Sequence, residues 1–427
     1  MMDHPLRHAL VDELHARPFP VLQAPAHVVF MALKEPGNSV NRDRGADLAL
    51  LNDWLAAQGM AAALPGAMHH TGQGGRASLK WESHTEFVTY AAFQPGLPDQ
   101  AFDPMEGEVF PKDWLAGSAA QRLVAGLIRV EEMPEDEAAM LARLEGWLQA
   151  ESLAVARVVD GAAVIAGDFR IDEGGYMRFA VFVRPGTGPR RVGRIVQRLC
   201  EIETYRAMSM LGLARVRDLT RVLNDLDPRL SALVGRLDES GGAESALHDL
   251  LQISAELERL SVQHGFRFGA TAAYQAIVAQ RITVLREERV AGRQSFGEFM
   301  MRRYDPAMRT VKSAEVRLNA MAERAARAAE LLRTRVDVER QAQNQKLLAS
   351  MDHRADLQLR LQHTVEGLSV VAISYYALGL LGYLAKPLAH WAHLDQTWVM
   401  AGLVPVTLGL VWWGLRWIKS GHTQNLP

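Results

Sequence analysis

The chain has 427 residues, a formal net charge of −2 at pH 7 and a single cysteine, Cys200. This length allows a sizeable core and more than one domain, and the near-neutral charge gives no sign of a nucleic-acid-binding surface, so no nucleic-acid partner is expected. One cysteine excludes an intramolecular disulfide and a cluster of thiolate metal ligands, which fits a cytosolic location for the soluble part.

Residues 1–187 are predicted to form a cytosolic α+β domain. Short segments rich in β-branched and aromatic residues predict strands, and two segments with a helical period predict helices at 42–59 and 135–150. Asp160-Gly161 is a strong two-residue hairpin signal, so the last three strands are expected to form an antiparallel meander. The predicted strands are 27–33, 77–93, 123–131, 153–159, 162–171 and 176–183.

Residues 188–305 are predicted to form a helical domain, with helices at 190–213, 216–225, 243–264, 271–290 and 296–303. A very long helix, called the stalk, is then expected over 306–364. After Pro306 no proline or glycine occurs before Gly367, and at ~1.5 Å per residue this run can form one helix roughly 90 Å long.

The stalk carries apolar residues at alternating spacings of three and four, which form a heptad seam. Two interpretations remain open: a coiled coil with a partner helix, or packing on the chain's own helices. The seam consists of Val311, Ala314, Leu318, Met321, Ala325, Ala328 and Leu332.

Two apolar segments of about 20 residues end the chain, the length that a helix needs to cross a bilayer core. They predict transmembrane helices at 365–385 and 397–418, an external connector at 386–396 and a cytosolic tail at 419–427. Buried helices of a soluble protein rarely stay apolar for so long in tandem, and tryptophans near the segment ends favour the membrane interpretation. Basic residues precede the first crossing and follow the second, so both termini are expected to be cytoplasmic. The lipid bilayer is thus an expected partner.

Within the first crossing, Glu366, Ser369, Ile373 and Tyr376 share a face at helical spacing. An ionisable group at membrane depth is usually functional, so these four residues are candidates to line a pore. The alternative is an interfacial carboxylate at Glu366, in the headgroup zone.

The WESHTEF run places Glu82, His84 and Glu86 at alternate positions. On a strand their side chains would share a face and offer ligands for a divalent cation. The alternative is the solvated face of a half-buried strand. His15 and Arg17 of the HARPF segment are candidates to complete such a site. The sequence contains no serine elbow, HExxH helix, phosphate loop or dinucleotide fingerprint, and nothing argues for an enzyme.

The segments HARPFP (15–20), LKWESHTEF (79–87) and TVEGLSVVAISYYALGLLGY (364–383) resemble a bacterial family of unknown function, described as an uncharacterised membrane-anchored protein. The resemblance spans nearly the whole chain. It implies an integral protein of the bacterial inner membrane, without an established activity or catalytic residues.

The order of parts also resembles the CorA family of magnesium channels, in which five subunits line a pore with the first crossing. That family carries a Gly-Met-Asn signature after this crossing. Here the sequence reads Gly-Tyr-Leu-Ala-Lys-Pro at 382–387, so the signature is missing, and Lys386 would repel cations.

Three hypotheses follow. The first is a homo-oligomeric, CorA-like ion channel or transporter, assembled through the stalk and the first crossing and gated by the cytosolic domain. The second is a non-transporting anchor for a cytosolic binding or signalling module. The third is a membrane-bound enzyme that uses the neighbourhood of His84.

Overall fold

The computed structural model describes residues 3–4, 6–8, 10–11, 18–37, 41–75, 77–235, 242–391 and 395–422. The chain divides into two compact units. The first comprises Met1–Ser240 and Ser245–Ala329, and the second comprises Gly241–Glu244 and Glu330–Pro427. The predicted sheet region and the helices that follow it thus belong to one unit.

The first unit is built on one mixed sheet, which has nine strands in the described part of the chain. Its order is β2-β3-β4-β1-β5-β8-β7-β6-β9. β5 and β8 run parallel, and the other described neighbours run antiparallel. The strands are β1 (Ala26–Lys34), β2 (His69–Gly74), β3 (Ala77–Ser83), β4 (Val88–Pro95), β5 (Gln121–Glu132), β6 (Ala154–Val158), β7 (Ala163–Ile171), β8 (Met177–Val183) and β9 (Glu288–Arg289).

The predicted mixed α+β character is confirmed, and the meander β6-β7-β8 forms around Asp160-Gly161, both in the left-handed region. Two strands were not predicted. β2 has the sequence HHTGQG, which has low strand propensity, but it pairs with β3 along its whole length. β9 has only two residues, and its place depends on pairing with β6. Both strands form because they pair with a neighbouring strand in the sheet, and local strand propensity does not reveal such pairing.

One face of the sheet is covered by α2 (Arg44–Ala57), η1 (Pro104–Val109), α3 (Lys112–Ala116) and α4 (Glu137–Trp147). Large side chains from both layers form the core there, and the buried indole of Trp54 donates a hydrogen bond to the Val109 oxygen at 2.8 Å. Members of this core include Trp54, Leu79, Trp81, Tyr90, Phe110, Leu144 and Phe182.

Glu106, in η1, is a buried carboxyl group, 8% exposed, that accepts a hydrogen bond from the backbone of Asp103 in a capping box. Burial raises its pKa to about 7 from an ordinary value of 4.5. Between these pH values the unfolded chain has released a proton that the folded chain retains, so the free energy of unfolding falls as the pH rises through this window.

We therefore expect Glu106→Gln, which preserves the capping acceptor, to raise the free energy of unfolding at pH 8 by up to about 3 kcal/mol and to have little effect at pH 4. Urea unfolding at the two pH values measures the difference. Glu108→Gln, at an exposed position of the same short helix, is the matched control. An equal effect of Glu106→Gln at both pH values would contradict the assignment.

The opposite face of the sheet carries α5 (Pro189–Gly235) and α6 (Ala243–Leu285), followed by α7 (Phe296–Arg303) and the start of α8 (Asp305–Trp391). The predicted breaks in this region are wrong: 190–213 and 216–225 form one helix, and 243–264 continues through residues 265–270 to Leu285. Both long helices bury apolar residues along their length, so packing overrides the weak local signals for a break.

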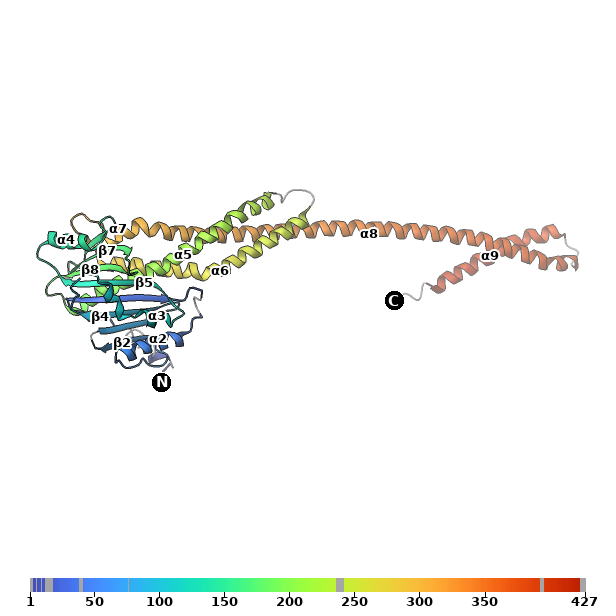
Figure 1. Cartoon of the computed structure of the whole chain (residues 1–427). Helices are drawn as coiled ribbons and strands as arrows, with labels where there is room; N and C mark the ends of the chain where they lie inside the picture. Colours follow the sequence, from blue (N-terminus) through green and yellow to red (C-terminus); the bar gives the residue numbers. More distant parts are fainter. Residues whose placement is uncertain are drawn as a thin grey trace. The chain divides into compact units, whose positions relative to one another are not determined.

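α5, α6 and the beginning of α8 lie side by side (Figure 1). Arg317 and Arg324 of α8 both pair with Asp227 of α5, and Arg281 of α6 pairs with Glu201 near the start of α5. Every residue of the heptad seam is buried within the single chain, at 8% exposure or less. Of the two interpretations of the seam, packing on the chain's own helices is the one confirmed.

The second unit contains the rest of α8 and α9 (Gln396–His422). α8 continues to Trp391, beyond the predicted end of the first crossing at residue 385. Ser374 and Thr407 are buried among exposed neighbours, and a Cβ atom on Gly382 would lie 3.0 Å from the Met400 sulfur. Small residues thus allow close packing of the two helices.

Each of these two helices contains a stretch that is long and apolar enough to cross a membrane, by length and composition. Only 11% of the first stretch and 6% of the second are buried within the chain. The core helix of a soluble protein would be mostly buried, so both stretches are candidate membrane spans.

Candidate functional site

The WESHTEF run (81–87) forms the end of one strand and the tight turn that leads into the next. β3 ends at Ser83, β4 begins at Val88, and the His84 backbone nitrogen donates to the Phe87 oxygen at 2.9 Å. The expected single strand over 77–93 is therefore wrong, and Glu82, His84 and Glu86 do not share a strand face. The reason is that the chain reverses at the very residues whose alternation suggested the common face.

Glu86 points from this turn toward α6 and is fully buried. Its carboxylate accepts hydrogen bonds from both terminal nitrogens of Arg267, and from the Tyr274 hydroxyl at 2.9 Å. Lys34 Nζ lies 3.6 Å away. The Glu86 carboxylate thus links the turn to α6 through these hydrogen bonds.

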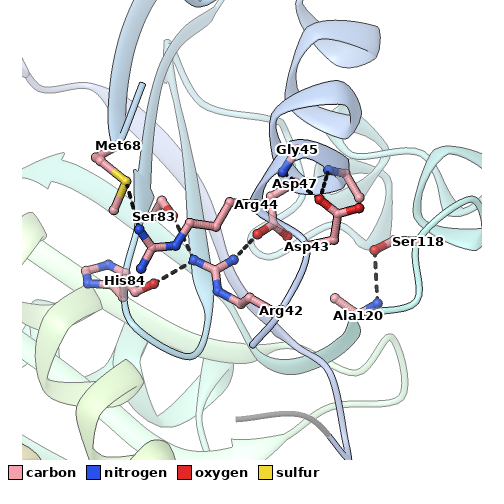
Figure 2. A network of polar contacts seen from close by, with 11 residues as sticks. Arg42, Asp43, Arg44, Gly45, Asp47, Met68, Ser83, His84, Ser118 and Ala120 are labelled. Atoms are coloured by element: carbon pink, nitrogen blue, oxygen red, sulfur yellow. Dashed lines mark hydrogen bonds and ion pairs between the residues drawn. The ribbon is translucent and has the colours of Figure 1, made fainter. Parts of the chain in front are cut away.

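The other side of the turn is held by Arg42, which precedes α2 (Figure 2). Its guanidinium donates to the Ser83 hydroxyl at 2.7 Å and to the His84 backbone oxygen at 2.6 Å, and it forms an ion pair with Asp47. Burial lowers the pKa of Arg42 and raises that of Asp47. Two buried arginines therefore fix the turn that carries His84.

Beside the turn lies a cavity of about 240 Å³, which we call the sheet–helix cavity. The register aligns Glu82 with Thr89 and Lys80 with Ala91, so these alternate residues of β3 and β4 face the helices. Their neighbours Leu79, Trp81 and Tyr90 face the opposite core. The floor of the cavity is thus a patch of sheet with polar groups on β3 and β4 and an apolar side chain, Phe30, on β1.

α5 and α6 close the cavity from the other side. Gln197, Cys200, Glu201 and Tyr205 come from successive turns of α5, and Arg281 comes from α6. The Glu201 carboxylate forms an ion pair with Arg281 and accepts a hydrogen bond from Gln197 Nε2 at 2.7 Å. Burial raises the pKa of the Cys200 thiol. This cysteine therefore lines the cavity as a neutral thiol and is not a nucleophile.

The end of the HARPFP segment also reaches the cavity. Phe19 lines it, the Leu22 nitrogen donates to the Pro189 oxygen at 3.2 Å, and Pro20 lies against Gly193 of α5. A Cβ atom on Gly193 would overlap the backbone oxygen of Pro20, so only glycine permits this contact. His15 and Arg17, the candidates from this segment, lie outside the described residues.

We expect Gly193→Val to force the Pro20 backbone away from α5 and so to open the cavity beside Phe19. Alkylation of Cys200, the single cysteine, should then be about tenfold faster, because access of the reagent limits a partly buried thiol. Mass spectrometry of the intact chain measures the rate. Gly235→Val is the matched control, since nothing lies within 4 Å of a Cβ atom there. Unchanged alkylation in Gly193→Val would contradict the contact.

The structure thus brings Glu82 and His84 to one cavity and directs Glu86 elsewhere. His84 stacks on Phe87 with ring centroids 4.3 Å apart, and its Nε2 lies 3.4 Å from the Thr89 hydroxyl. In the described part of the chain, no three His, Cys, Asp or Glu side chains group as metal ligands. The divalent-cation role of these residues stays a prediction.

All four pore-lining candidates lie on α8 at helical spacing, so they share one side of that helix. Ser369, Ile373 and Tyr376 are exposed, whereas Glu366 is partly covered and lies 3.7 Å from His363. The Ser369 hydroxyl donates to the Val365 oxygen at 2.8 Å, within its own helix. The side of α8 that packs on α9 carries Ser374 instead, which sequence reasoning did not single out.

Sequence reasoning also missed Lys80, Glu201 and Arg281. The sequence does contain a signal for Lys80, because it alternates with Glu82 on β3. Glu201 and Arg281 are 80 residues apart in the sequence and meet only because α5 and α6 pack together, so no local pattern reveals them.

A comparison with curated proteins gives no match. A family model described as "Protein of unknown function (DUF3422)" matches residues 2–422, nearly the whole chain, including both the sheet–helix cavity and the two candidate membrane spans. The chain therefore belongs to this family of proteins of unknown function.

Proposed function

We propose that this chain is an inner-membrane protein in which the soluble unit controls the membrane helices, and that it works as a homo-oligomeric ion channel or transporter. The observation that carries the proposal is the continuity of α8. One helix of 87 residues begins beside α5 and contains the first candidate span, without glycine or proline between Ala307 and Glu366.

A passive anchor requires only a flexible linker, and a glycine- or serine-rich segment would serve. A continuous helix instead transmits rotation or translation from one end to the other, as small shifts of packed helices do in switching proteins. α8 packs against α5, and α5 forms a wall of the sheet–helix cavity. Occupation of this cavity is therefore well placed to bias the position of α8.

In the proposed membrane arrangement both termini are cytoplasmic. Arg354 and Arg360 precede the first span, and Arg416 and Lys419 close the second. The exposed face with Ser369, Ile373 and Tyr376 points away from the α9 contact, which makes it available to other copies of the chain. We propose that this face lines the path in an oligomer.

The test uses the full-length chain in detergent and in proteoliposomes. We expect an oligomer by mass measurement and a flux of at least one of Mg²⁺, K⁺, Na⁺ and Cl⁻ above that of empty liposomes. Lys80→Met, in the cavity, should change this flux without changing the oligomer. A monomer without flux of any of these ions would refute the proposal.

One observation favours the second candidate, a non-transporting anchor: the heptad seam is already buried by the chain's own helices. Assembly through a coiled-coil stalk is thus not required to cover it. This candidate predicts that a chain lacking residues 364–427 keeps the binding properties of the full-length protein, with no dependence on oligomeric state.

A further inference from the structure

The sheet–helix cavity contains a buried ammonium group with unused hydrogen-bonding capacity. Lys80 is 7% exposed, and its Nζ atom has no hydrogen-bond partner among the described residues. Among the described residues, it forms an ion pair with Glu82 Oε1 at 3.4 Å. An ammonium group has three donors, and leaving them unsatisfied in a buried site is costly, so the cavity calls for an acceptor at this place.

On the helix side of the cavity, a buried acceptor lacks a hydrogen-bond donor. The Oε1 atom of Gln197 is buried and has no hydrogen-bond partner in the described part of the chain, because its Nε2 is directed to Glu201. An amide oxygen accepts up to two hydrogen bonds. The same cavity therefore lacks an acceptor at the sheet and a donor at the helix α5.

The charges around the cavity balance. Lys80 and Glu82 supply one pair at the sheet, and Arg281 and Glu201 supply a second pair at the helices. Phosphate or a dicarboxylate would meet two carboxylates, and a divalent cation would meet an ammonium and a guanidinium. A molecule that carries one positive and one negative group fits this field best.

The apolar walls and the volume of the cavity further restrict the class of ligand that it can bind. Phe19, Phe30 and Phe93 give one side of the cavity an apolar, aromatic surface. A volume of about 240 Å³ is below the range of pockets for drug-sized ligands. We propose that the sheet–helix cavity binds a small zwitterion of the α-amino-acid class with an apolar side chain. Its carboxylate accepts from Lys80, and its ammonium donates to Gln197 Oε1.

This inference deepens the proposed function and rests on it in one respect, the use of the cavity as the control site for α8. Binding is measured on the full-length chain in detergent by isothermal titration calorimetry, with each common amino acid as the probe. Succinate, inorganic phosphate, Mg²⁺ and n-butylamine are the comparison probes.

We expect saturable binding of at least one apolar amino acid and none of the four comparison probes. Affinity should fall by at least about tenfold in Gln197→Leu and in the charge-neutral double variant Lys80→Met/Glu82→Gln, since each removes a buried polar contact. The double variant leaves no unpaired carboxylate, so it tests binding without a large cost in folding. Gln94→Leu, in a separate cavity beside Met105, should bind as the unaltered chain does.

Three results would overturn the inference: no binding of any amino acid, preferred binding of a comparison probe, or affinity unchanged in both cavity variants. Flux separates this failure from failure of the proposed function. Amino-acid binding without any flux refutes the channel or transporter alone, whereas flux without amino-acid binding refutes the zwitterion site alone.

Discussion

Replacing Glu86 with alanine is expected to lower the free energy of unfolding by about 3–5 kcal/mol. The carboxylate is fully buried and receives both terminal nitrogens of Arg267 and the Tyr274 hydroxyl. Its removal takes away the carboxylate that the buried Arg267 guanidinium and the Lys34 ammonium both face. Urea unfolding of the full-length chain in detergent, followed by tryptophan fluorescence, measures the loss.

The double variant Glu86→Leu/Arg267→Met distinguishes an interaction from simple truncation. Because it removes the paired carboxylate and guanidinium together, keeps apolar volume and leaves only the Lys34 ammonium without this carboxylate, we expect it to be less destabilising than Glu86→Ala. Glu256→Ala, at an exposed ion pair of the same helix α6, is the matched control and should cause only a small fraction of the change. Equal losses for Glu86→Ala and Glu256→Ala would show that the buried network does not hold the turn.

The Glu86 network also shows where sequence reasoning stops. The alternation in the WESHTEF run predicts a continuous strand, whereas in the structure β3 ends at Ser83 and a turn follows. Turn sequences usually contain glycine, proline or asparagine, and residues 84–87 contain none of them. The turn exists because Arg42 and Arg267 hold it from two sides, and these arginines are distant in sequence.

Elsewhere in the chain too, features set by local sequence could be predicted, and features set by contacts between distant residues could not. The apolar stretches of α8 and α9 could be predicted, since length and composition decide them locally. The seam of α8 could be found as well, but its partner could not, because a heptad pattern does not state whether the facing helix belongs to the same chain. The cavity required the register of β3 and β4 and the packing of α5 on α6, neither of which local patterns encode.

The control that α8 is proposed to exert can be tested by breaking the helix at one exposed position. Ser350 is solvent-exposed in the interior of α8. Proline there removes a backbone donor and clashes with the preceding turn, at a local cost of about 3 kcal/mol or more, and kinks or breaks the helix. We expect hydrogen exchange to accelerate in the residues around Ser350→Pro, while the sheet of the first unit stays protected.

The functional expectation is a loss of coupling rather than a loss of flux. In proteoliposomes, Lys80→Met should change the flux of the unaltered helix but should have no effect in the Ser350→Pro background, because a broken helix does not transmit the change in the cavity. Ser350→Ala, which retains the helix, must preserve the response to Lys80→Met. If the response survives in Ser350→Pro, the continuity of α8 is not what connects the cavity to the spans. The helix would then be only a support for the anchor.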